Sequence, residues 1–401
     1  MDRRQLLQRM AALTALPALS YSSQLLAAPT VQNKLLLVFL RGGYDACHLL
    51  VPTGSSFYYE SRPNIAIARP GTGADSALAL NADWGLHPVL RDSIYPLYLQ
   101  NEIAFVPFAG TDDLSRSHFE TQDSIELGQP LNGRRDFHSG FMNRLAAVLN
   151  SSGGPVPAMA FTDQLPLAMQ GQAEVVNTAV RNISRQNLDA RQSQLIEKMY
   201  GQTGLAQQVN EGFTVRQEVA REMQEEMDAA NRNAITTKSF TLEAQRIAKM
   251  MRDKYTLGFV DIGGWDTHVD QGAAKGMLAG KLDELGRGLT AFRDGMGSQW
   301  QQTTVVVISE FGRTFRENGK RGTDHGHGSV YWVMGGNVRG GQILGEQISL
   351  TPGQLFQNRD YPVLNEYRAI LGGLFGRLYG LNSQQLNTVF QGVRAKEIGL
   401  L

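Results

Sequence analysis

Apolar residues in this chain occur in short uninterrupted runs rather than in alternation with polar ones. The clearest run is residues 305–308 (VVVI), and similar runs occupy residues 34–40 and 102–108 and the start of residues 257–268. A strand without alternation is buried on both faces, as in a parallel sheet that helices cover above and below. The pattern predicts an α/β fold whose central, mostly parallel sheet lies between helices.

Helical periodicity fills the stretches between these runs. It predicts helices over residues 88–101, 136–149, 281–301 and 367–379, and a further strand over residues 331–334. Residues 182–255 are dense in Gln, Glu, Arg and Ala with periodic apolar positions, which is typical of a helical insertion or lid. Ser117 and Glu120 have the spacing of a capping box, so another helix is expected to begin there.

Ionisable residues gather directly after the apolar runs or in the loops beyond them. Because the carboxyl ends of parallel strands meet at one edge of a sheet, we expect these residues to converge. Carboxylates and imidazoles are suitable ligands for Zn, Mn, Ca or Mg. The sequence therefore predicts a divalent metal site made from the following residues: Asp45, Asp266, His268, Glu310, Asp324, His325 and His327.

A plainer interpretation exists for parts of this set. Glu310 could pair with Arg313, and the loop that carries His325 and His327 could simply be solvated. Several of the chain's seven histidines nevertheless follow predicted strands, and clustered histidines and carboxylates are typical of functional sites. That clustering favours the metal site.

Ser117, His118 and Arg313 are candidate catalytic residues. A hydroxyl at the start of a helix lies where an anion such as phosphate or sulfate is also held, so Ser117 is a candidate nucleophile with His118 beside it. The alternative is that Ser117 only caps its helix. Arg313 or Arg116 could hold the anionic part of a substrate.

Composition narrows the possible partners. Lys plus Arg and Asp plus Glu both number 38, so no basic field indicates a nucleic-acid partner. The single cysteine, Cys47, excludes an intrachain disulfide and a cysteine-rich metal site. With 42% apolar residues over 401 positions, the chain can bury a large core.

The first 27 residues resemble a twin-arginine export signal. Arg3 and Arg4 precede an uncharged, moderately apolar stretch that ends in small residues. The alternative is a membrane anchor, but Pro17 and several polar residues interrupt the stretch short of the roughly 20 residues that span a bilayer. We therefore expect a signal over residues 1–27 and a single domain over residues 28–401. The twin-arginine machinery would be the export partner, the periplasm the destination, and the mature protein would have no stable membrane span.

Five motifs taken together resemble a known bacterial family, catalogued as domain of unknown function 1501. They are residues 41–45 (RGGYD), 117–119 (SHF), 263–268 (GGWDTH), 309–313 (SEFGR) and 322–326 (GTDHG). The family is grouped with the alkaline phosphatase and sulfatase superfamily, which has a largely parallel sheet between helices and a metal site at the strand tips. The resemblance implies an exported, metal-dependent hydrolase of a phosphate or sulfate ester, acting on an anionic small molecule or polymer.

The resemblance also assigns roles to particular residues. Asp45 resembles a carboxylate that binds one metal beside the nucleophile, while Asp266 and His268 resemble ligands of another metal. Glu310 stands where the superfamily has an Asp-His pair, but Phe311 follows it and cannot ligate, so His325 or His327 would have to substitute. This departure leaves a second interpretation open, a non-catalytic binding or structural module that keeps the fold and one metal.

Overall fold

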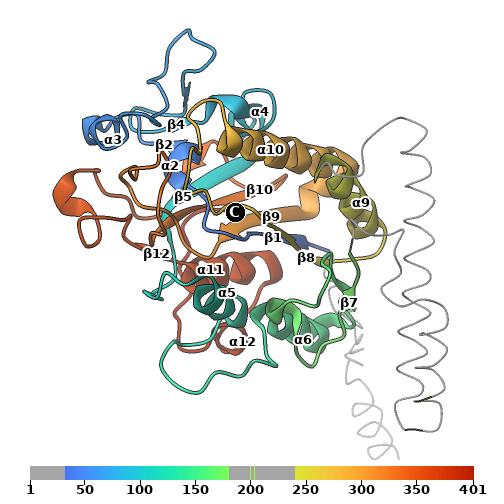
Figure 1. Ribbon diagram of the computed structural model, residues 1–401. Coiled ribbons are helices and arrows are strands. Elements are labelled where there is room, and N and C mark those ends of the chain that lie inside the picture. Colours follow the sequence, from blue (N-terminus) through green and yellow to red (C-terminus); the bar gives the residue numbers. More distant parts are fainter. Residues whose placement is uncertain (1–31, 180–198, 200–202, 204–239) are drawn as a thin grey trace, which may run out of the picture. The chain divides into compact units, whose positions relative to one another are not determined.

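The apolar runs form the central strands of a nine-stranded sheet (Figure 1). The structure, a computed structural model, describes residues 32–179, 199, 203 and 240–401. The strands of this sheet are, in their order across it, β11 (Gln342–Ile343), β5 (Ile103–Gly110), β10 (Ser329–Gly335), β9 (Thr303–Ser309), β1 (Lys34–Leu40), β8 (Leu257–Ile262), β6 (Ala158–Ala160) and β7 (Val176–Asn177), with β12 (Asn365–Glu366) paired to β5. A separate small sheet contains β2 (Leu50–Val51), β4 (Gly85–Leu86) and β3 (Leu78–Ala79).

The centre of the sheet is parallel, as the apolar runs predict. β1 pairs in parallel with both neighbours, and its last residue, Leu40, lies opposite Ile262 of β8 and Ser309 of β9. β10 is antiparallel to β9 and to β5, so β5 runs in the same direction as β9. The carboxyl ends of β1, β5, β8 and β9 and the start of β10 therefore lie at one edge. The α/β fold with a mostly parallel sheet is confirmed.

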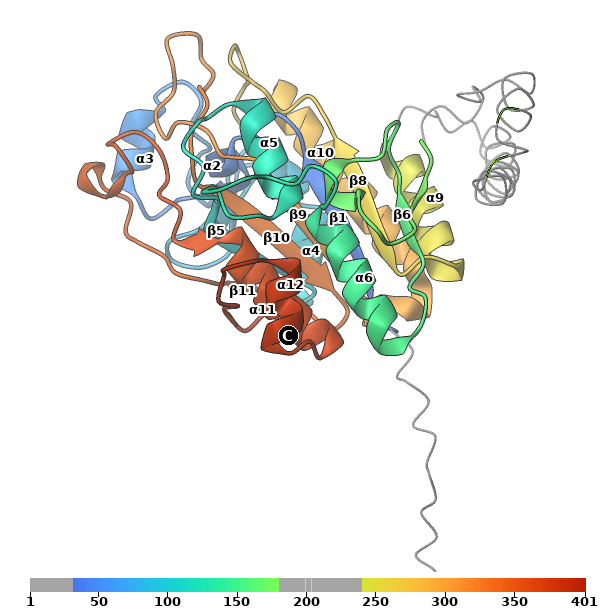
Figure 2. The same ribbon diagram turned by 90° about the horizontal axis from the view of Figure 1, so that it is seen from below.

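Helices cover both faces of the sheet (Figure 1). Leu36 and Val38 of β1 pack into one apolar cluster with α4, α9 and α10, whereas Leu35 and Leu37 pack into another with α5, α6, α11 and α12, the layer nearest the viewer in Figure 2. Each such side chain contributes about 1.5–3 kcal/mol when fully buried. Two cores thus fix the strands, and the strands fix the edge where the loops begin.

The helices have the following bounds: α2 (Ala46–Leu49), α3 (Ser56–Ser61), η1 (Pro88–Leu90), α4 (Ile94–Leu99), α5 (His118–Leu127), α6 (Phe141–Gly153), η2 (Leu167–Met169), α9 (Phe240–Asp253), α10 (Met277–Met296), η3 (Gly297–Gln302), η4 (Pro352–Gln354), α11 (Tyr367–Tyr379) and α12 (Ser383–Val389). The predicted helix over residues 367–379 is confirmed as α11. That over residues 281–301 corresponds to α10 followed by η3.

Two predicted helices have different limits. Residues 88–101 form the short turn η1 and then α4, because Pro96 lacks an amide proton and is tolerated only in a first helical turn. The helix expected over residues 136–149 begins only at Phe141, since the backbone before it is used elsewhere: the Asp136 carbonyl accepts from Gln129, and Gly140 donates to the Gln170 carbonyl. Local bonding of the loop thus outweighs helical propensity.

The predicted helical insertion over residues 182–255 falls mostly outside the described residues. Its last part is α9, whose residues Phe240, Ile247 and Met251 are buried in the core against α10. This part is therefore a layer of the fold rather than a lid. Among the described residues, no helix combines the length and the apolar character needed to cross a membrane.

Candidate metal centre

Loops from five strands meet at the carboxyl edge of the sheet. Asp266 and His268 follow β8, Glu310 follows β9, and His118 begins α5 in the connection after β5. His325 lies in the loop that leads into β10. Gly42 lets the loop after β1 approach closely, because its φ is +126° and an added Cβ would lie 2.6 Å from the Asp266 amide nitrogen.

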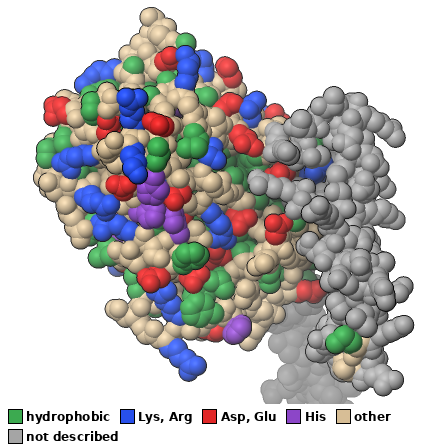
Figure 3. Space-filling view, in the orientation of Figure 1, with side chains coloured by type: hydrophobic (Ala, Val, Ile, Leu, Met, Phe, Trp, Pro, Cys, Tyr) green, Lys and Arg blue, Asp and Glu red, His purple; other side chains and the backbone are tan. Residues whose placement is uncertain are grey.

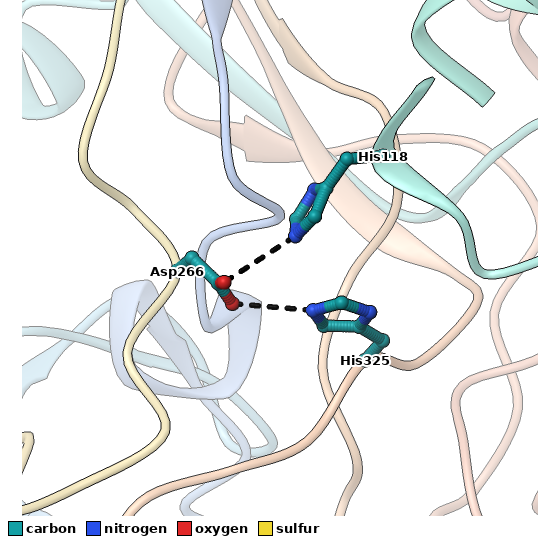
Figure 4. Close-up of side chains that lie close together, drawn as sticks. All are labelled: His118, Asp266 and His325. Carbon is teal, nitrogen blue, oxygen red and sulfur yellow. Dashed lines mark hydrogen bonds and ion pairs between the residues drawn. The ribbon is translucent and has the colours of Figure 1, made fainter. Parts of the chain in front are cut away.

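Three imidazoles surround the Asp266 carboxylate, and two of them, His118 and His325, are drawn in Figure 4. His118 Nε2 lies 3.4 Å from Asp266 Oδ2, and His325 Nε2 lies 3.2 Å from Asp266 Oδ1. His268 Nε2 lies 2.8 Å from Asp266 Oδ1 and 3.2 Å from His325 Nε2. Histidine side chains accordingly form a visible group on the surface in Figure 3. His118, Asp266 and His325 form the tightest set, with one ligand atom from each within 4.8 Å of the others.

The other ring nitrogen of each imidazole, Nδ1, lies within hydrogen-bond distance of an oxygen atom. His118 Nδ1 lies 2.9 Å from Glu310 Oε1, His325 Nδ1 lies 3.0 Å from the Arg116 carbonyl, and His268 Nδ1 lies 3.3 Å from Asp324 Oδ1. A carbonyl or carboxylate oxygen can only accept, so a proton on Nδ1 satisfies each of these three contacts, while a proton on Nε2 would satisfy the contact of the same ring with Asp266. In the tautomer with the proton on Nδ1, the three Nε2 atoms present lone pairs towards Asp266, which is the orientation of histidines that ligate a metal and is favourable when a cation lies between them.

This donor set fits a divalent cation. The neutral rings would place the lone pairs of His268 Nε2 and His325 Nε2 opposite each other at 3.2 Å, a repulsive contact unless a proton or cation is shared. A tetrahedral site with metal–nitrogen distances of about 2.0–2.1 Å has ligand atoms about 3.3–3.4 Å apart. The contacts of His118 and His325 with Asp266, at 3.4 Å and 3.2 Å, are close to that spacing, and that of His268 is shorter at 2.8 Å. His118 Nε2 is also buried and makes no hydrogen bond to any described residue.

The pKa values of His118 and His325 are shifted in opposite directions. The hydrogen bond to Glu310 raises the pKa of His118, whereas burial and the neighbouring His118 lower the pKa of His325. Burial raises the pKa of Asp266, but the hydrogen bond and charge of Arg313 outweigh it, so this pKa lies below its ordinary value. The carboxylate is therefore ionised, and His118 is the imidazole at which a proton competes most strongly with a metal.

Arg313 and Phe311 form the base of the site. The Arg313 side chain is fully buried; its Nη1 donates to Asp266 Oδ1 at 2.7 Å and its Nε to Thr323 Oγ1 at 3.3 Å. Its Nη2 is buried without a hydrogen-bond partner among the described residues. The Phe311 ring lies 4.9 Å from the His118 ring and 5.0 Å from the His325 ring. Phe311 thus packs against the imidazoles and supplies no ligand atom.

Glu310 supports the site from behind. It is fully buried, and its carboxylate accepts from the Gly42 amide at 2.7 Å, from His118 at 2.9 Å and from Gln122 at 2.9 Å. Burial alone would raise the pKa of Glu310, but these hydrogen bonds outweigh burial. The pKa therefore lies below its ordinary value, and the carboxylate is ionised. The structure therefore places Glu310 where it orients His118, although the sequence predicts it as a ligand.

Asp45 reaches the same edge but has other partners. Its carboxylate is 1% exposed and accepts from Arg62 Nη1 at 2.6 Å and Arg62 Nη2 at 3.0 Å, and Gln271 Nε2 donates to it at 2.7 Å. His48 is fully buried beside it and bonds to the Gly272 carbonyl. The counter-charge of Asp45 is supplied by Arg62, which is also fully buried, and not by the imidazoles around Asp266.

The remaining predicted residues lie around the site. Asp324 is half exposed and contacts His268 and Asn318. His327 has other contacts: its ring packs against Phe356, with the ring centroids 5.0 Å apart, and burial lowers its pKa to about 4. Arg116 bonds to Asp360 and Gln357, so in this structure its guanidinium is used away from the imidazoles.

Ser117 occupies the N-cap position of α5, as its spacing predicts, but its hydroxyl makes no capping hydrogen bond to the described helix amides. The predicted capping box is therefore wrong in its bonding: Glu120 is exposed, and the Ser117 amide bonds to Ser115 Oγ instead. With no bond to the helix, the hydroxyl has no structural role there that would conflict with chemistry.

Sequence reasoning missed several supporting residues. Gln122 follows His118 by four positions on the same helix, a spacing that could have placed both on one face. Arg62, Gln271 and Thr323 gave no signal, because each meets its partner only through the tertiary fold.

Residues 107–390 match a family model described as a protein of unknown function, DUF1501. This chain belongs to the DUF1501 family. The family predicted from the five motifs is thus confirmed. Comparison with curated proteins finds no match.

Among solved structures, the DUF1501 chain is similar to a protein in the alkaline phosphatase superfamily from Vibrio parahaemolyticus. The identity is 11% and the TM-score 0.37, over 94% of this chain and 75% of that one. It is also similar to Ps i-CgsB, at 11% identity and a TM-score of 0.37 over 90% and 74% of the two chains. The complex of Ps i-CgsB with k-i-k-neocarrahexaose gives 11% and 0.36 over 88% and 73%.

Proposed function

We propose that this protein is a metal-dependent hydrolase of a phosphate or sulfate ester on a small or polymeric anionic substrate. The observation that carries the proposal is the convergence of three imidazole Nε2 atoms on one ionised carboxylate, with every Nδ1 held by an acceptor. Structural ion pairs rarely need three such rings. A cation site needs them, because only imidazoles with a fixed tautomer present their lone pairs to one point.

His118, Asp266 and His325 would hold the metal, with His268 in contact with two of them. When bound there, a divalent ion polarises an ester oxygen and lowers the pKa of water. Glu310 keeps the proton of His118 on Nδ1, so that Nε2 stays available as a ligand. The Arg116 carbonyl does the same for His325.

Arg313 would hold the anionic group. Its position is fixed by Asp266 and Thr323, and its Nη2, which has no hydrogen-bond partner in the described part of the chain, is a donor that an anion oxygen would satisfy. The attacking group is either water or the Ser117 hydroxyl, which directly precedes His118 and makes no capping bond to the described helix.

The test is metal analysis of the purified protein, followed by chelation, reloading with Zn, Mn, Ca or Mg, and assay on phosphate and sulfate esters. We expect about one divalent ion in the centre and ester turnover that chelation abolishes and reloading restores. His325→Gln should lose both metal and turnover. His327→Gln is the matched control and should retain both, since that histidine of the same loop packs against Phe356.

The same experiment separates the alternative. A non-catalytic binding or structural module would bind the metal through the same rings but hydrolyse no ester in the panel. The structure supports the metal site more directly than the reaction, so metal without turnover would favour the module. Neither metal nor turnover in protein reloaded with each ion would overturn the proposal itself.

We further propose export to the periplasm by the twin-arginine machinery, on the basis of Arg3, Arg4 and the uncharged stretch after them. Replacing both arginines by lysine should leave the protein in the cytoplasm with residues 1–27 attached. Normal export of that variant in cell fractionation would contradict this proposal without bearing on the metal centre.

A further inference from the structure

A cavity of about 540 Å³ lies apart from the imidazole centre, the group formed by His118, Asp266, His268 and His325. Three segments far apart in sequence form its walls: residues 52–60, residues 83–84 and residues 347–352. This volume is in the range of small-molecule sites, which run from about 300 to 1,000 Å³. None of its lining residues belongs to the imidazole centre, so its occupant need not be the ester that the centre would cleave.

The walls of the cavity are tied to one another. Ser55 Oγ donates to the Leu350 carbonyl at 2.8 Å, and Trp84 Nε1 donates to Gln347 Oε1 at 2.9 Å. The Gly54 amide donates to the Asp83 carbonyl at 3.0 Å. Each bond joins two of the three segments. The cavity is therefore preformed, which reduces the ordering cost that a ligand would otherwise bear.

The lining excludes anions. Its two ionisable side chains, Glu60 and Asp83, are both carboxylates, and none of the described lining residues is Lys or Arg. A phosphate or sulfate group would meet like charge there with no cationic partner. The cavity is thus unsuited to the charged part of an ester substrate.

The lining is also amphipathic. Hydroxyl, amide and carboxylate groups come from Ser56, Glu60, Asp83, Gln347, Ser349 and Thr351, and apolar surface comes from Pro52, Ile348, Leu350 and Pro352. A saccharide has the matching character, with hydroxyls around its rim and C–H groups on its faces. Carboxylates accept hydrogen bonds from such hydroxyls and give stronger bonds than neutral acceptors do.

An organic cation matches this lining less well. Glu60 and Asp83 are both exposed, so their attraction for a cation is weakened by solvent and salt. Phe57 already stacks on Phe315 at 5.0 Å and has the Arg316 guanidinium over its ring at 5.1 Å, so its faces are in use. Trp84 is only 4% exposed and offers little ring face. A cage of open aromatic faces, which cation recognition needs, is not formed by these residues.

We propose that this cavity is a binding site for a neutral saccharide of one or two sugar units, held by Glu60 and Asp83 through its hydroxyls. The site is independent of the proposed hydrolase reaction. It would bring the protein to glycan material, or hold the sugar part of a larger molecule.

Calorimetric titration of the full-length protein tests this proposal. The probes are maltose, cellobiose, lactose and chitobiose, with 3′-sulfated lactose as the anionic counterpart and choline and putrescine as cations. We expect saturable one-to-one binding of at least one neutral disaccharide. If that disaccharide is lactose, its sulfated form should bind more weakly. Glu60→Gln with Asp83→Asn should weaken binding about tenfold or more.

The control is Asp253→Asn with Glu397→Gln, which removes the same two charges from exposed positions outside the cavity and should bind like the wild type. All four carboxylates are exposed, so the variants should fold, which thermal unfolding checks. Binding of none of the sugars, binding of the cations alone, or equal loss in both double variants would overturn the proposal. Loss of sugar binding in Asp266→Asn but not in Glu60→Gln/Asp83→Asn would move the sugar to the imidazole centre.

Discussion

Asp266 and Asp45 begin from nearly the same place in the fold. They follow the neighbouring parallel strands β8 and β1, whose last residues, Ile262 and Leu40, lie opposite each other. The Asp266 side chain is 41% exposed and faces three imidazoles, whereas the Asp45 side chain is 1% exposed and faces the buried guanidinium of Arg62. The partner that the fold brings to a carboxylate therefore decides whether that carboxylate can hold a metal or only anchors the structure.

The two regions also compensate their charges differently. Burial alone would raise the pKa of Asp45, but Arg62 and His48 outweigh it, so this pKa lies far below its ordinary value. That pair is complete and needs no further cation. Around Asp266, Arg313 supplies one positive charge, while His118 Nε2 and Arg313 Nη2 are buried without a hydrogen-bond partner among the described residues. The region around Asp266, where buried polar atoms lack partners among the described residues, is therefore the one suited to bind a ligand.

A buried chain of polar contacts joins Asp45 to Asp266. Gln271 donates to Asp45 and accepts from Thr323 Oγ1 at 3.0 Å, and Thr323 in turn accepts from Arg313, which holds Asp266. Gln271 and Thr323 are both fully buried. The comparison can therefore be tested at each end and in the middle.

The largest effect is expected for Asp266→Asn. A neutral amide gives up the charge that holds a divalent ion, so metal occupancy should fall to background and turnover should drop by about three orders of magnitude or more. Metal analysis and the ester assay measure these. Thermal unfolding of the metal-free protein should show a smaller loss of stability than Asp45→Asn does, because Asp266 is 41% exposed, although the buried Arg313 loses its charged partner. Full metal occupancy in the variant would remove Asp266 from the ligand set.

Asp45→Asn should have its main effect on stability rather than on metal binding. It leaves Arg62 charged and buried without its partner, which typically costs about 3–5 kcal/mol of unfolding free energy. Urea denaturation measures the loss, and Asp45→Asn combined with Arg62→Met should recover part of it. A stable Asp45→Asn variant that loses its metal instead would make Asp45 a ligand, as its resemblance to the superfamily implies.

The same pair predicts an acid response. Because the folded pKa of Asp45 is depressed, its stabilisation is present above the unfolded pKa of about 3.9 and is lost as the pH falls below that value towards the folded pKa. Wild-type protein should therefore lose stability more steeply below about pH 4 than the Asp45→Asn/Arg62→Met variant. Chemical denaturation at a series of pH values measures this, and parallel curves would contradict it.

An intermediate effect is expected for Gln271→Met. The change removes the amide that bonds to Asp45 and to Thr323 inside the protein, which should cost about 1–3 kcal/mol in urea denaturation. The next contact, Arg313 Nε to Thr323, is long at 3.3 Å, so metal affinity should change less than about threefold. A tenfold loss of metal affinity would show that the two regions act as one unit.

The smallest effect on stability is expected for Ser117→Ala. Because the hydroxyl makes no capping bond to the described helix amides, the change should alter unfolding free energy by less than about 0.5 kcal/mol. A loss near 1 kcal/mol would instead indicate a helix cap. Turnover of the same variant distinguishes the two attacking groups: loss with metal retained identifies Ser117 as the nucleophile, and retention points to water.

The sequence was a good guide to the strands and to the edge where chemistry collects. Unbroken apolar runs can only be buried on both faces, so the runs at residues 34–40 and 305–308 indicate central strands by their pattern alone. Helix limits were harder to predict. Residues 136–140 have helical composition, but their backbone bonds to Gln129 and Gln170, contacts that no local pattern records.

By itself, the sequence determined the fold class, the family and the set of carboxylates and histidines at the strand tips. Only the tertiary structure decided which of them share partners. The charge of Asp45 is neutralised by Arg62, Glu310 accepts from His118, and His327 packs against Phe356. Sequence spacing fixes where a side chain begins. Its charge and lone pairs are assigned by neighbours from distant segments, and in a buried site those neighbours set whether it serves as a ligand, an orienting acceptor or an anchor.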